Sequence, residues 1–455
     1  MDTIFANASG MGGGISIIRV SGAHAIEIVD QIFQSKKNKK LADQKTYTMH
    51  YGHIIDKQDH IVDEVLVLLM RAPHSYTAED VVEIDCHGGQ FVVCRIMDLL
   101  LAQGARPAEP GEFTKRAFLN GRIDLSQAES VMDVINAQNH FALDSSMKQL
   151  HGAVKDKIIS LREQILRETA FIEAALDDPE HYELDGYGDK LLPIVDCLVA
   201  EIDHLLKNSD NGRVLSEGLK TVIVGKPNAG KSSLMNLLLG TDYAIVTDVA
   251  GTTRDILEKD YNLDGITLHI TDTAGIRDTQ DAVEKIGVER AKRSVEEADL
   301  VLYVVDSSLA LNDEDEEILS LISNKKVIVL LNKCDLSPVV TKQQLEDRLK
   351  APVIICSAKF GDGMRELNEQ IKAMFLHGEI TYNDEVYITN LRQKDCLIEA
   401  LNSLRLVKQS IEDMVPEDFY TVDLLHAYEK LGLIIGESIT DDLADKIFSE
   451  FCMGK

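Results

Sequence analysis

The chain has 455 residues, a formal net charge of −29 and 45% hydrophobic residues. This length is too great for one hydrophobic core and predicts two or three domains. The negative charge excludes a broad, non-specific nucleic-acid-binding surface, because the phosphates would be repelled. Any nucleic acid must therefore be bound by a local basic patch or through a basic partner protein.

No segment has the character of an export signal or a membrane span. No apolar run approaches the length that crosses a bilayer, and residues 1–5 lack the basic and apolar regions of a signal peptide. The seven cysteines are scattered, with no Cys-x-x-Cys pair, which indicates reduced thiols. We therefore expect a cytoplasmic protein.

The first half of the chain predicts an α/β domain followed by helices. Residues 1–120 hold strand patterns at 14–20, 61–69 and 81–86 and helical patterns at 23–33 and 90–103. Residues 121–215 are mainly helical. The apolar stripe of the first long helix consists of Leu150, Val154, Ile158, Leu161, Ile165 and Ile172. A second helix is expected at 190–207, with a linker at 209–212.

The second half alternates between strands and helices and then becomes helical again. Residues 216–380 predict a mainly parallel sheet that is covered on both faces. Residues 381–455 carry another apolar stripe, Leu397, Leu401, Leu404 and Ile411. Neither helical segment can bury its stripe alone, so we expect 381–455 to pack against 121–215. The α/β domain between them would be an insertion.

Residues 225–232 read G-x-x-x-x-G-K-S, between a β-branched apolar run and a helix-forming run. This is a phosphate-binding P-loop, whose backbone N–H groups and helix N-terminus attract phosphates. Lys231 would reach the β- and γ-phosphates, and Ser232 would bind Mg²⁺. The nucleotide contacts expected here are Asn228, Ala229, Gly230, Lys231, Ser232 and Ser233.

Four further motifs follow in the order of a GTPase. Asp335, in Asn332-Lys333-Cys334-Asp335, would accept two hydrogen bonds that guanine offers and adenine does not. Ser357, Ala358 and Lys359 fit the loop whose backbone N–H contacts guanine O6. Asp272 would hold the Mg²⁺ water shell and Gly275 the γ-phosphate, with Thr273 and Ala274 between them. Switch I is expected at Thr247, Asp248, Val249, Ala250, Gly251, Thr252 and Thr253, where one threonine hydroxyl should reach Mg²⁺.

Ile276 stands where Ras-type enzymes have the glutamine that orients the attacking water. An isoleucine cannot orient water, so hydrolysis needs other groups. We expect a monovalent cation, held by Asn228 and by carbonyls near Thr247 and Val249, to neutralise charge between the β- and γ-phosphates. Among the switch II acids Asp278, Asp281 and Glu284, we choose Glu284 to orient the water, although it fits equally well as a first-turn acid of the next helix.

The P-loop and switch I sequences resemble those of the TrmE/Era class of potassium-dependent GTPases. The segments 87–89, 113–129 and 451–455 narrow the resemblance to the MnmE (TrmE) family of tRNA-modifying GTPases, over the whole chain. The resemblance implies a multidomain fold. Its parts are an N-terminal α/β folate-binding-like domain, a discontinuous α-helical domain and an inserted Ras-like α/β P-loop G domain.

The resemblance also implies an activity and partners. The family adds a carboxymethylaminomethyl or aminomethyl group at C5 of wobble uridine 34 of certain tRNAs. A tetrahydrofolate derivative, 5-formyl or 5,10-methylene, supplies the one-carbon unit, and K⁺ and Mg²⁺ serve GTP hydrolysis. The protein is expected to form a homodimer and, with a FAD-dependent MnmG-type partner, a heterotetramer.

Carried over by position, the resemblance also assigns residues. The folate contacts fall on Arg19, Glu83, Arg122 and Lys455. The family often has lysine at the position of Arg122, so the charge is kept while the geometry changes. The potassium ligands fall on Asn228, Thr247, Val249 and Thr252, the Mg²⁺ ligands on Ser232 and Thr253, and the water-orienting acid on Glu284. Cys452 is either a nucleophile in tRNA modification or, as we favour, a thiol that lines the folate site.

Two other functions fit part of the sequence. A ribosome-assembly GTPase of the Era or Der type would need a basic RNA-binding segment at the C-terminus, whereas this chain has acidic helices there. A folate-binding or aminomethyltransferase module with a regulatory G domain would share the first 120 residues. Loss of wobble modification on gene deletion would separate that module from a modification GTPase.

Overall fold

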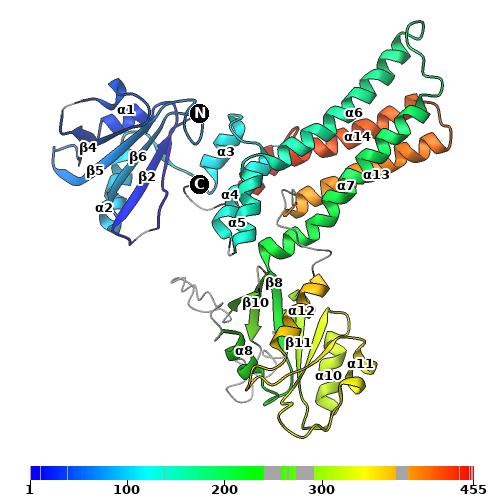
Figure 1. Ribbon diagram of the computed structural model, residues 1–455. Coiled ribbons are helices and arrows are strands. Elements are labelled where there is room, and N and C mark those ends of the chain that lie inside the picture. The colour runs from blue at the N-terminus through cyan, green and yellow to red at the C-terminus, as the bar shows by residue number, and fades with distance from the viewer. Residues whose placement is uncertain are drawn as a thin grey trace. The chain divides into compact units, whose positions relative to one another are not determined.

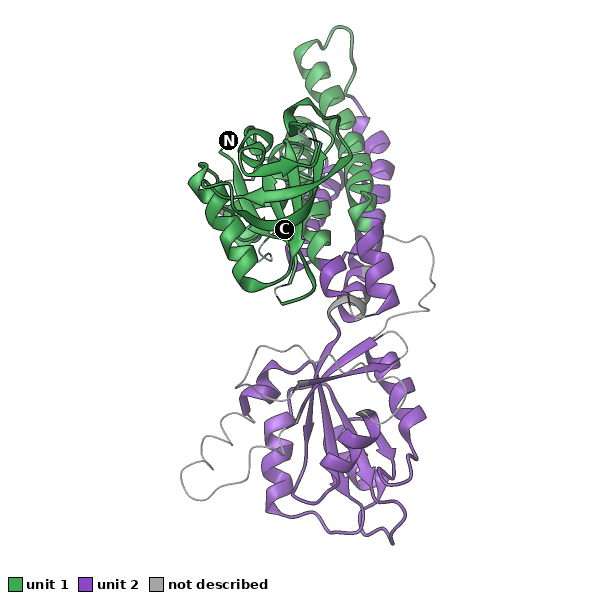
Figure 2. Cartoon of the chain, turned by 90° about the vertical axis from the view of Figure 1, so that its left-hand side faces the viewer, with its two compact units in different colours: residues 1–132, 149–184, 416–455 green, residues 133–148, 185–415 purple. Residues whose placement is uncertain are grey.

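The computed structural model describes residues 2–10, 12–37, 39–137, 139–239, 258–263, 266–272, 292–375, 388–439, 441–449, 451 and 454. The chain divides into two compact units (Figure 2). The first unit comprises residues 1–132, 149–184 and 416–455, and the second comprises 133–148 and 185–415. Among the described helices, none combines the length and apolar character that crossing a bilayer requires.

A seven-stranded sheet of order β3-β4-β5-β6-β2-β1-β7 forms the N-terminal part of the first unit (Figure 1). β1 and β7 are parallel, and the other neighbouring strands are antiparallel. The strands are β1 (Ile4–Asn7), β2 (Ile15–Ser21), β3 (Phe33–Ser35), β4 (Thr48–Ile55), β5 (Ile61–Met70), β6 (Val81–His87) and β7 (Arg106–Pro107).

The three predicted strands are confirmed as β2, β5 and β6, whereas β4 was not predicted. Gly52 interrupts the apolar pattern of β4, and the fold requires a glycine there because a Cβ would lie 2.3 Å from the carbonyl oxygen of Gln34. Both predicted helices are also present. α1 (Ala25–Asp30) and α2 (Gln90–Ala102) each bury one apolar face in a common core with the sheet.

The helices of the first unit come from both ends of the chain. α6 (Ala153–Asp177) lies alongside α14 (Asp418–Ile435), as Figure 1 shows. α3 (Glu112–Leu119) packs against α15 (Asp441–Ser449) around Ala117 and Phe448. The shorter α4 (Leu125–Asn136) and α5 (His140–Leu150) precede α6 in the chain, and α5 belongs mostly to the second unit. The packing of distant helical segments on each other agrees with the predicted discontinuous helical domain.

In the second unit, α7 (Tyr187–Glu217) lies alongside α13 (Leu391–Glu412), and Lys408 Nζ is 2.6 Å from Asp196 Oδ1. The linker predicted at 209–212 is wrong, because α7 continues through these residues. Val214, near the end of α7, is 4% exposed in the core of the following α/β domain. Burial of this end of the helix therefore outweighs the weak helix propensity of Asn and Gly.

The α/β part of the second unit is a six-stranded sheet of order β13-β12-β11-β8-β10-β9. Only β9 is antiparallel to its neighbour. The strands are β8 (Leu219–Val224), β9 (Glu258–Leu263), β10 (Ile266–Asp272), β11 (Leu300–Asp306), β12 (Val327–Asn332) and β13 (Val353–Ile355). The helices described with them are α8 (Lys231–Leu239), α10 (Asp313–Ile322), α11 (Lys342–Leu349) and α12 (Met364–Phe375).

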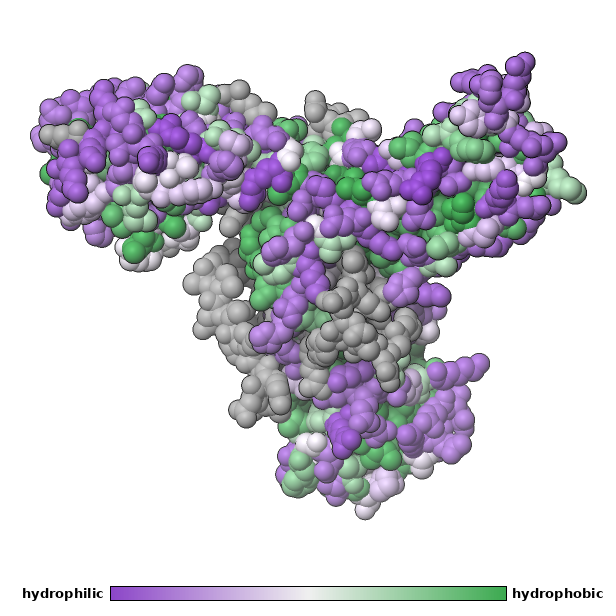
Figure 3. Space-filling model, turned by 45° about the horizontal axis from the view of Figure 1, so that its top comes forward, coloured by the Kyte–Doolittle hydropathy of each residue, from purple (hydrophilic) through white to green (hydrophobic). Residues whose placement is uncertain are grey.

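Two separate hydrophobic cores contain alternate residues of the central strands, so both faces of this sheet are covered, as predicted. The parallel strands bring their carboxyl ends to one edge, where the P-loop and the motifs after β12 and β13 emerge. In the face shown in Figure 3, hydrophilic residues cover much of the described surface, which fits the net charge of −29.

Candidate functional site

The P-loop joins β8 to α8, and two of its glycines are required by close approaches. Gly225 has φ +152°, and a Cβ there would lie 2.4 Å from the carbonyl oxygen of Val304. Gly230 has φ +104°, and its Cβ would lie 2.1 Å from Nδ2 of Asn332. Only glycine accepts both the positive φ and the contact, so the loop backbone can pass close to its neighbours.

Lys231 lies folded over the P-loop. Its Nζ donates hydrogen bonds of 2.8 Å to the carbonyl oxygens of Gly225 and Lys226. Ser232 and Ser233 follow in the first turn of α8 and are exposed. The backbone N–H groups of this turn have no partner within the helix, which is the arrangement that attracts a phosphate.

Asn332 connects the P-loop to the predicted guanine loop. Its Nδ2 donates to the carbonyl oxygen of Ala229 at 2.9 Å, and its Oδ1 accepts from the backbone N of Ala358 at 2.9 Å. Asp335 Oδ1 accepts a hydrogen bond of 2.9 Å from the hydroxyl of Ser357. The structure therefore brings together predicted residues from three separate loops, at the carboxyl edge of the sheet.

Lys333 and Asp306 form an ion pair that the sequence analysis did not identify. Lys333 has φ +64°, and its Nζ lies 2.5 Å from Asp306 Oδ2. Burial alone would raise the pKa of Asp306, but hydrogen bonds from Lys333 and Ser308 hold that pKa below its usual value. The sequence did contain a signal for this ion pair, because Asp306 is an acid at the end of the wholly buried strand β11. Lys359, the last residue of its motif, is exposed, with its Nζ 5.1 Å from the ring centre of Phe360.

Much of the predicted catalytic machinery lies outside the described residues. Asp272 ends β10, beside Ile223 of β8, so its backbone reaches the same edge of the sheet as the P-loop. The residues discussed in the sequence analysis that lie outside the described ranges are Thr247, Asp248, Val249, Ala250, Gly251, Thr252, Thr253, Thr273, Ala274, Gly275, Ile276, Asp278, Asp281, Glu284, Cys452 and Lys455.

Three of the residues predicted to bind folate lie together in the first unit. Arg19 of β2 and Glu83 of β6 are register partners, and Nε of the arginine is 2.7 Å from Oε1 of the glutamate. The guanidinium carbons of Arg19 and Arg122 lie 5.3 and 5.1 Å from the ring centre of Tyr76. Tyr76 was not predicted, since nothing in the sequence distinguishes it from other loop aromatics.

The end of the chain reaches the same place. Arg19 Nη1 donates a hydrogen bond of 3.1 Å to the carbonyl oxygen of Gly454. A Cβ on Gly454 would lie 2.7 Å from the carbonyl oxygen of Asn7, so Gly454 packs closely on the end of β1. The cluster therefore combines two strands, the separate loops that carry Tyr76 and Arg122, and Gly454 near the end of the chain.

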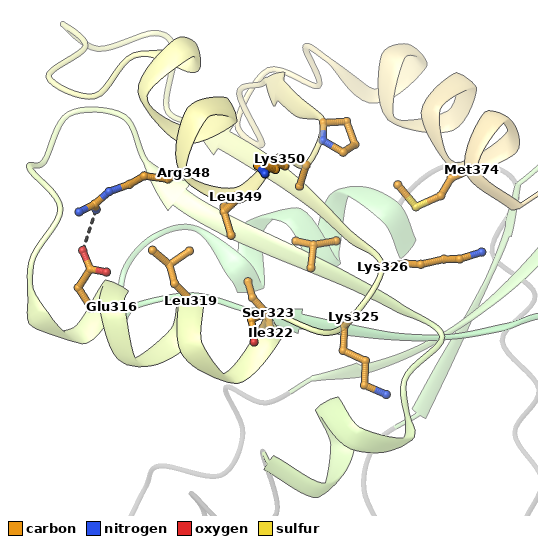
Figure 4. A pocket seen from close by; sticks show the side chains of 13 residues that line it. Glu316, Leu319, Ile322, Ser323, Lys325, Lys326, Arg348, Leu349, Lys350 and Met374 are labelled. Atoms are coloured by element: carbon orange, nitrogen blue, oxygen red, sulfur yellow. Dashed lines mark ion pairs between the residues drawn. The ribbon is translucent and has the colours of Figure 1, made fainter.

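A cavity of about 600 Å³ lies at the opposite edge of the six-stranded sheet (Figure 4). It is lined by residues that precede β12 and β13, including Lys325, Lys326 and Lys350. Arg348 Nη1 at its rim is 2.7 Å from Glu316 Oε1, the pair joined by the dashed line in Figure 4. None of the predicted nucleotide contacts lines this cavity, so it is distinct from the nucleotide site.

Some solved structures are similar to parts of the chain. Era of Aquifex aeolicus bound to GDP and AlF₄⁻ is 32% identical, over 41% of this chain and 67% of that chain, with a TM-score of 0.29. The G domain of the T. maritima FeoB iron transporter is 29% identical, over 35% of this chain and 99% of that chain, with a TM-score of 0.28.

Sequence comparisons cover the whole chain. Residues 3–122 match the family model of the GTP-binding protein TrmE N-terminus, and residues 125–452 match that of the MnmE helical domain. The tRNA modification GTPase MnmE of Lachnoclostridium phytofermentans is 53% identical, over 100% of this chain and 99% of that protein. The protein of the same name from Bacillus subtilis is 44% identical, over 100% of both. The chain therefore belongs to the MnmE (TrmE) family.

Proposed function

We propose that this protein is a tRNA modification GTPase that acts in the cytoplasm. The observation that carries the GTPase activity is the convergence of Asn332, Asp335 and the P-loop at one edge of a parallel sheet. The action on tRNA is supported by full-length relatives that are named for it.

The described residues can bind and orient GTP. Asp335 would accept hydrogen bonds from two N–H groups of guanine. The hydrogen bond from the Ala358 backbone N to Asn332 Oδ1 fixes the loop that is expected beside the base. Lys231 would exchange its two carbonyl partners for the β- and γ-phosphates, and hydrogen bonds between charged partners are stronger than those to neutral carbonyls. The first turn of α8 presents its N–H groups to the same phosphates.

The P-loop also fits the metal ions that the family uses. The Ser232 hydroxyl and the Asn228 amide are exposed, and oxygen ligands suit hard cations. We propose Ser232 and Thr253 for Mg²⁺, and Asn228, Thr247, Val249 and Thr252 for K⁺. When bound, these ions neutralise phosphate charge. Glu284 is proposed to orient the attacking water.

The cluster of the first unit fits a pterin with an acidic tail. Glu83 offers a carboxylate to a ring N–H edge, Arg19 and Arg122 offer cations, and Tyr76 offers a flat apolar face. We propose that these charged groups, with Lys455, bind a tetrahydrofolate derivative, 5-formyl or 5,10-methylene, that donates the one-carbon unit for C5 of wobble uridine 34. Cys452 is proposed to line this site.

The remaining parts of the proposal concern organisation. The chain is proposed to form a homodimer and to join a FAD-dependent MnmG-type partner in a heterotetramer that carries out the redox step. The proposed domains are residues 1–120 for folate and dimerisation, 121–215 and 381–455 for the helical domain, and 216–380 for the G domain.

Nucleoside analysis of tRNA from a deletion strain tests this function. The C5-modified wobble uridine should disappear, and a plasmid with the wild-type gene should restore it. A Lys231→Ala gene should not restore it, because the phosphates lose their cation. Normal nucleosides together with defective ribosome assembly would instead support the Era- or Der-type alternative.

A further inference from the structure

The acidic run at residues 313–317 is more than the solvated helix start that its composition suggests. α10 does begin in this run, but Asp315 is 1% exposed. Its Oδ1 accepts a hydrogen bond of 2.9 Å from the hydroxyl of Tyr303, and its Oδ2 accepts one of 2.8 Å from the backbone N of Asn312. The same Oδ2 lies 2.7 Å from Nζ of Lys226.

Lys226 belongs to the P-loop, and its side chain is only 13% exposed. Its Nζ also donates to Asn312 Oδ1 at 3.2 Å. Its backbone oxygen accepts from Lys231 Nζ at 2.8 Å and from the backbone N of Ala229 at 3.3 Å. The side chain of this residue is thus fixed to α10, while its backbone forms part of the loop and accepts from the N–H of Ala229.

The loop needs such an attachment. Gly225 and Gly230 stand on either side of Lys226, and both adopt positive φ values. Glycines lose more conformational entropy than other residues when a loop is ordered. A loop that is already ordered loses less conformational entropy when the nucleotide binds, so its affinity for the nucleotide is higher.

We propose that the Lys226–Asp315 pair is a tether that holds the P-loop in its phosphate-binding shape, with Tyr303 keeping the Asp315 carboxylate in place. The three are positioning residues, because they act through the loop backbone and not on the reacting atoms. The inference rests on the GTPase function proposed above. Since GDP and GTP share the loop, loss of the tether weakens both.

The experiment uses the full-length protein and three variants: Lys226→Met, which keeps the aliphatic stem, Asp315→Asn, and the two combined. Binding of GDP and GTP is measured by calorimetry, and GTP turnover is measured with Mg²⁺ and K⁺ present. We expect the Kd of both nucleotides to rise about tenfold in each variant, with KM rising in parallel and kcat within about twofold of wild type.

Thermal unfolding separates positioning from stability. Lys226→Met leaves the buried Asp315 carboxylate without its cation, so the Tm should fall. The combined variant removes that charge. The asparagine oxygen can still accept from the backbone N of Asn312, and its NH2 group can donate to the Tyr303 hydroxyl oxygen, so the Tm should recover. The Kd should nevertheless stay raised. A Kd that returns to the wild-type value together with the Tm would overturn the tether.

Two further variants complete the test. Glu316→Gln changes the next residue of α10, which is 54% exposed and pairs with Arg348 at 2.7 Å, away from the P-loop (Figure 4). It should leave both Kd values unchanged. Lys226→Arg keeps the cation and should bind nucleotide within about threefold of wild type.

The outcomes also distinguish this inference from the proposed function. Wild-type protein that neither binds nor hydrolyses GTP would contradict the GTPase itself. Wild-type turnover with unchanged Kd values in all three tether variants would contradict the tether alone and leave the GTPase standing.

Discussion

At the residue scale, the proposed recognition of guanine depends on the carboxylate of Asp335. The Ser357 hydroxyl donates to one of its oxygens at 2.9 Å, which fixes the plane that faces the base. Guanine presents two N–H groups to such a carboxylate, so both oxygens act as acceptors.

Replacing Asp335 with asparagine turns one acceptor oxygen into an NH2 donor. This donor would face an N–H donor of guanine, so one hydrogen bond is lost. We expect the GTP affinity of Asp335→Asn to fall by about 10²–10³-fold, whereas xanthosine triphosphate, which carries a carbonyl there, should bind better. Competition with a fluorescent nucleotide measures both. Asp347→Asn, an exposed position of α11, is the control, and equal losses for the two nucleotides would refute the assignment.

Asn228 is the described residue among the proposed potassium ligands. It is exposed in the P-loop, with φ +62°. Asn228→Ala removes the amide oxygen, so turnover in potassium should fall to the level seen in sodium. Asn236→Ala, another exposed asparagine nearby in α8, should retain the difference between the salts. Full potassium stimulation of the Asn228 variant would rule out the cation role.

Glu284 offers a test of the water-orienting role. Glu284→Ala should slow hydrolysis by about 10²–10³-fold with nearly unchanged GTP affinity, because general-base and orienting groups act mainly in the transition state. Single-turnover hydrolysis and equilibrium binding provide the two quantities. An unchanged rate of hydrolysis would instead favour the alternative interpretation, in which Glu284 is only a first-turn acid of a helix.

At the element scale, Arg162 joins α6 to α14. Its side chain is 8% exposed, its Nε donates to the carbonyl oxygen of Tyr428 at 3.2 Å, and its Nη2 lies 2.6 Å from Glu437 Oε2. The guanidinium carbon also lies 3.9 Å from the ring centre of Tyr428. One arginine thus supplies both polar and stacking contacts between helices that are far apart in sequence.

Arg162→Met keeps the aliphatic stem but leaves the Tyr428 carbonyl without this donor. We expect the free energy of unfolding to fall by about 2 kcal/mol, with a lower Tm, because the variant loses the hydrogen bond to Tyr428 and the ion pair with Glu437 together. Circular dichroism during heating measures the change. Arg167→Met, at an exposed position of the same helix, should have little effect, and equal Tm losses in both variants would attribute the change to helix propensity.

The strands and helices differ in how far their positions could be predicted. The apolar stripes of α6 and α13 follow the helical period, so both helices were predicted. β4 was missed because Gly52 and two histidines break its alternation, and α7 was cut short at Ser209 because local propensity suggested a loop. In both cases, packing against a distant segment decided the outcome.

At the scale of the whole molecule, charged groups from distant segments meet in the first unit. Arg106 Nη2 lies 2.6 Å from Glu112 Oε1, and Arg116 Nη2 lies 2.7 Å from Asp2 Oδ1. Burial alone would raise the pKa of Glu112, but hydrogen bonds from Arg106, the Glu109 backbone and Arg116 hold that pKa below its usual 4.5. The folded state therefore favours the charged glutamate.

A depressed pKa has a definite effect on stability against pH. The stabilisation is complete above 4.5, the usual pKa of glutamate, and is lost as the pH falls through the lowered value. As the pH falls from 4.5 to the lowered pKa, the free energy of unfolding should decrease more in the wild type than in the Glu112→Gln variant. Urea unfolding followed by circular dichroism suits a chain without tryptophan. Glu109→Gln, an exposed neighbour, should behave as wild type, and parallel curves for all three would contradict the assignment.

The two units separate the two proposed chemistries. Arg19 and Glu83 lie in the first unit, and the P-loop lies in the second. Arg19→Ala should therefore abolish tRNA modification in a complemented deletion strain while GTP turnover of the purified protein continues. Truncation before Cys452 should have the same effect. Loss of GTP turnover in the Arg19 variant would contradict this division.

The sequence by itself determined the family, the order of the domains and the positions of the GTPase motifs. Those features depend on local requirements, namely glycine where φ is positive, helical or alternating spacing, and donors or acceptors at fixed offsets. Tertiary structure alone decided that Asp315 is buried beside Lys226, that Asn332 joins two loops, and that Tyr76 lies close to both Arg19 and Arg122. The reason is physical: a polar side chain is buried only where a distant partner compensates its lost hydration, and chain spacing does not specify that partner.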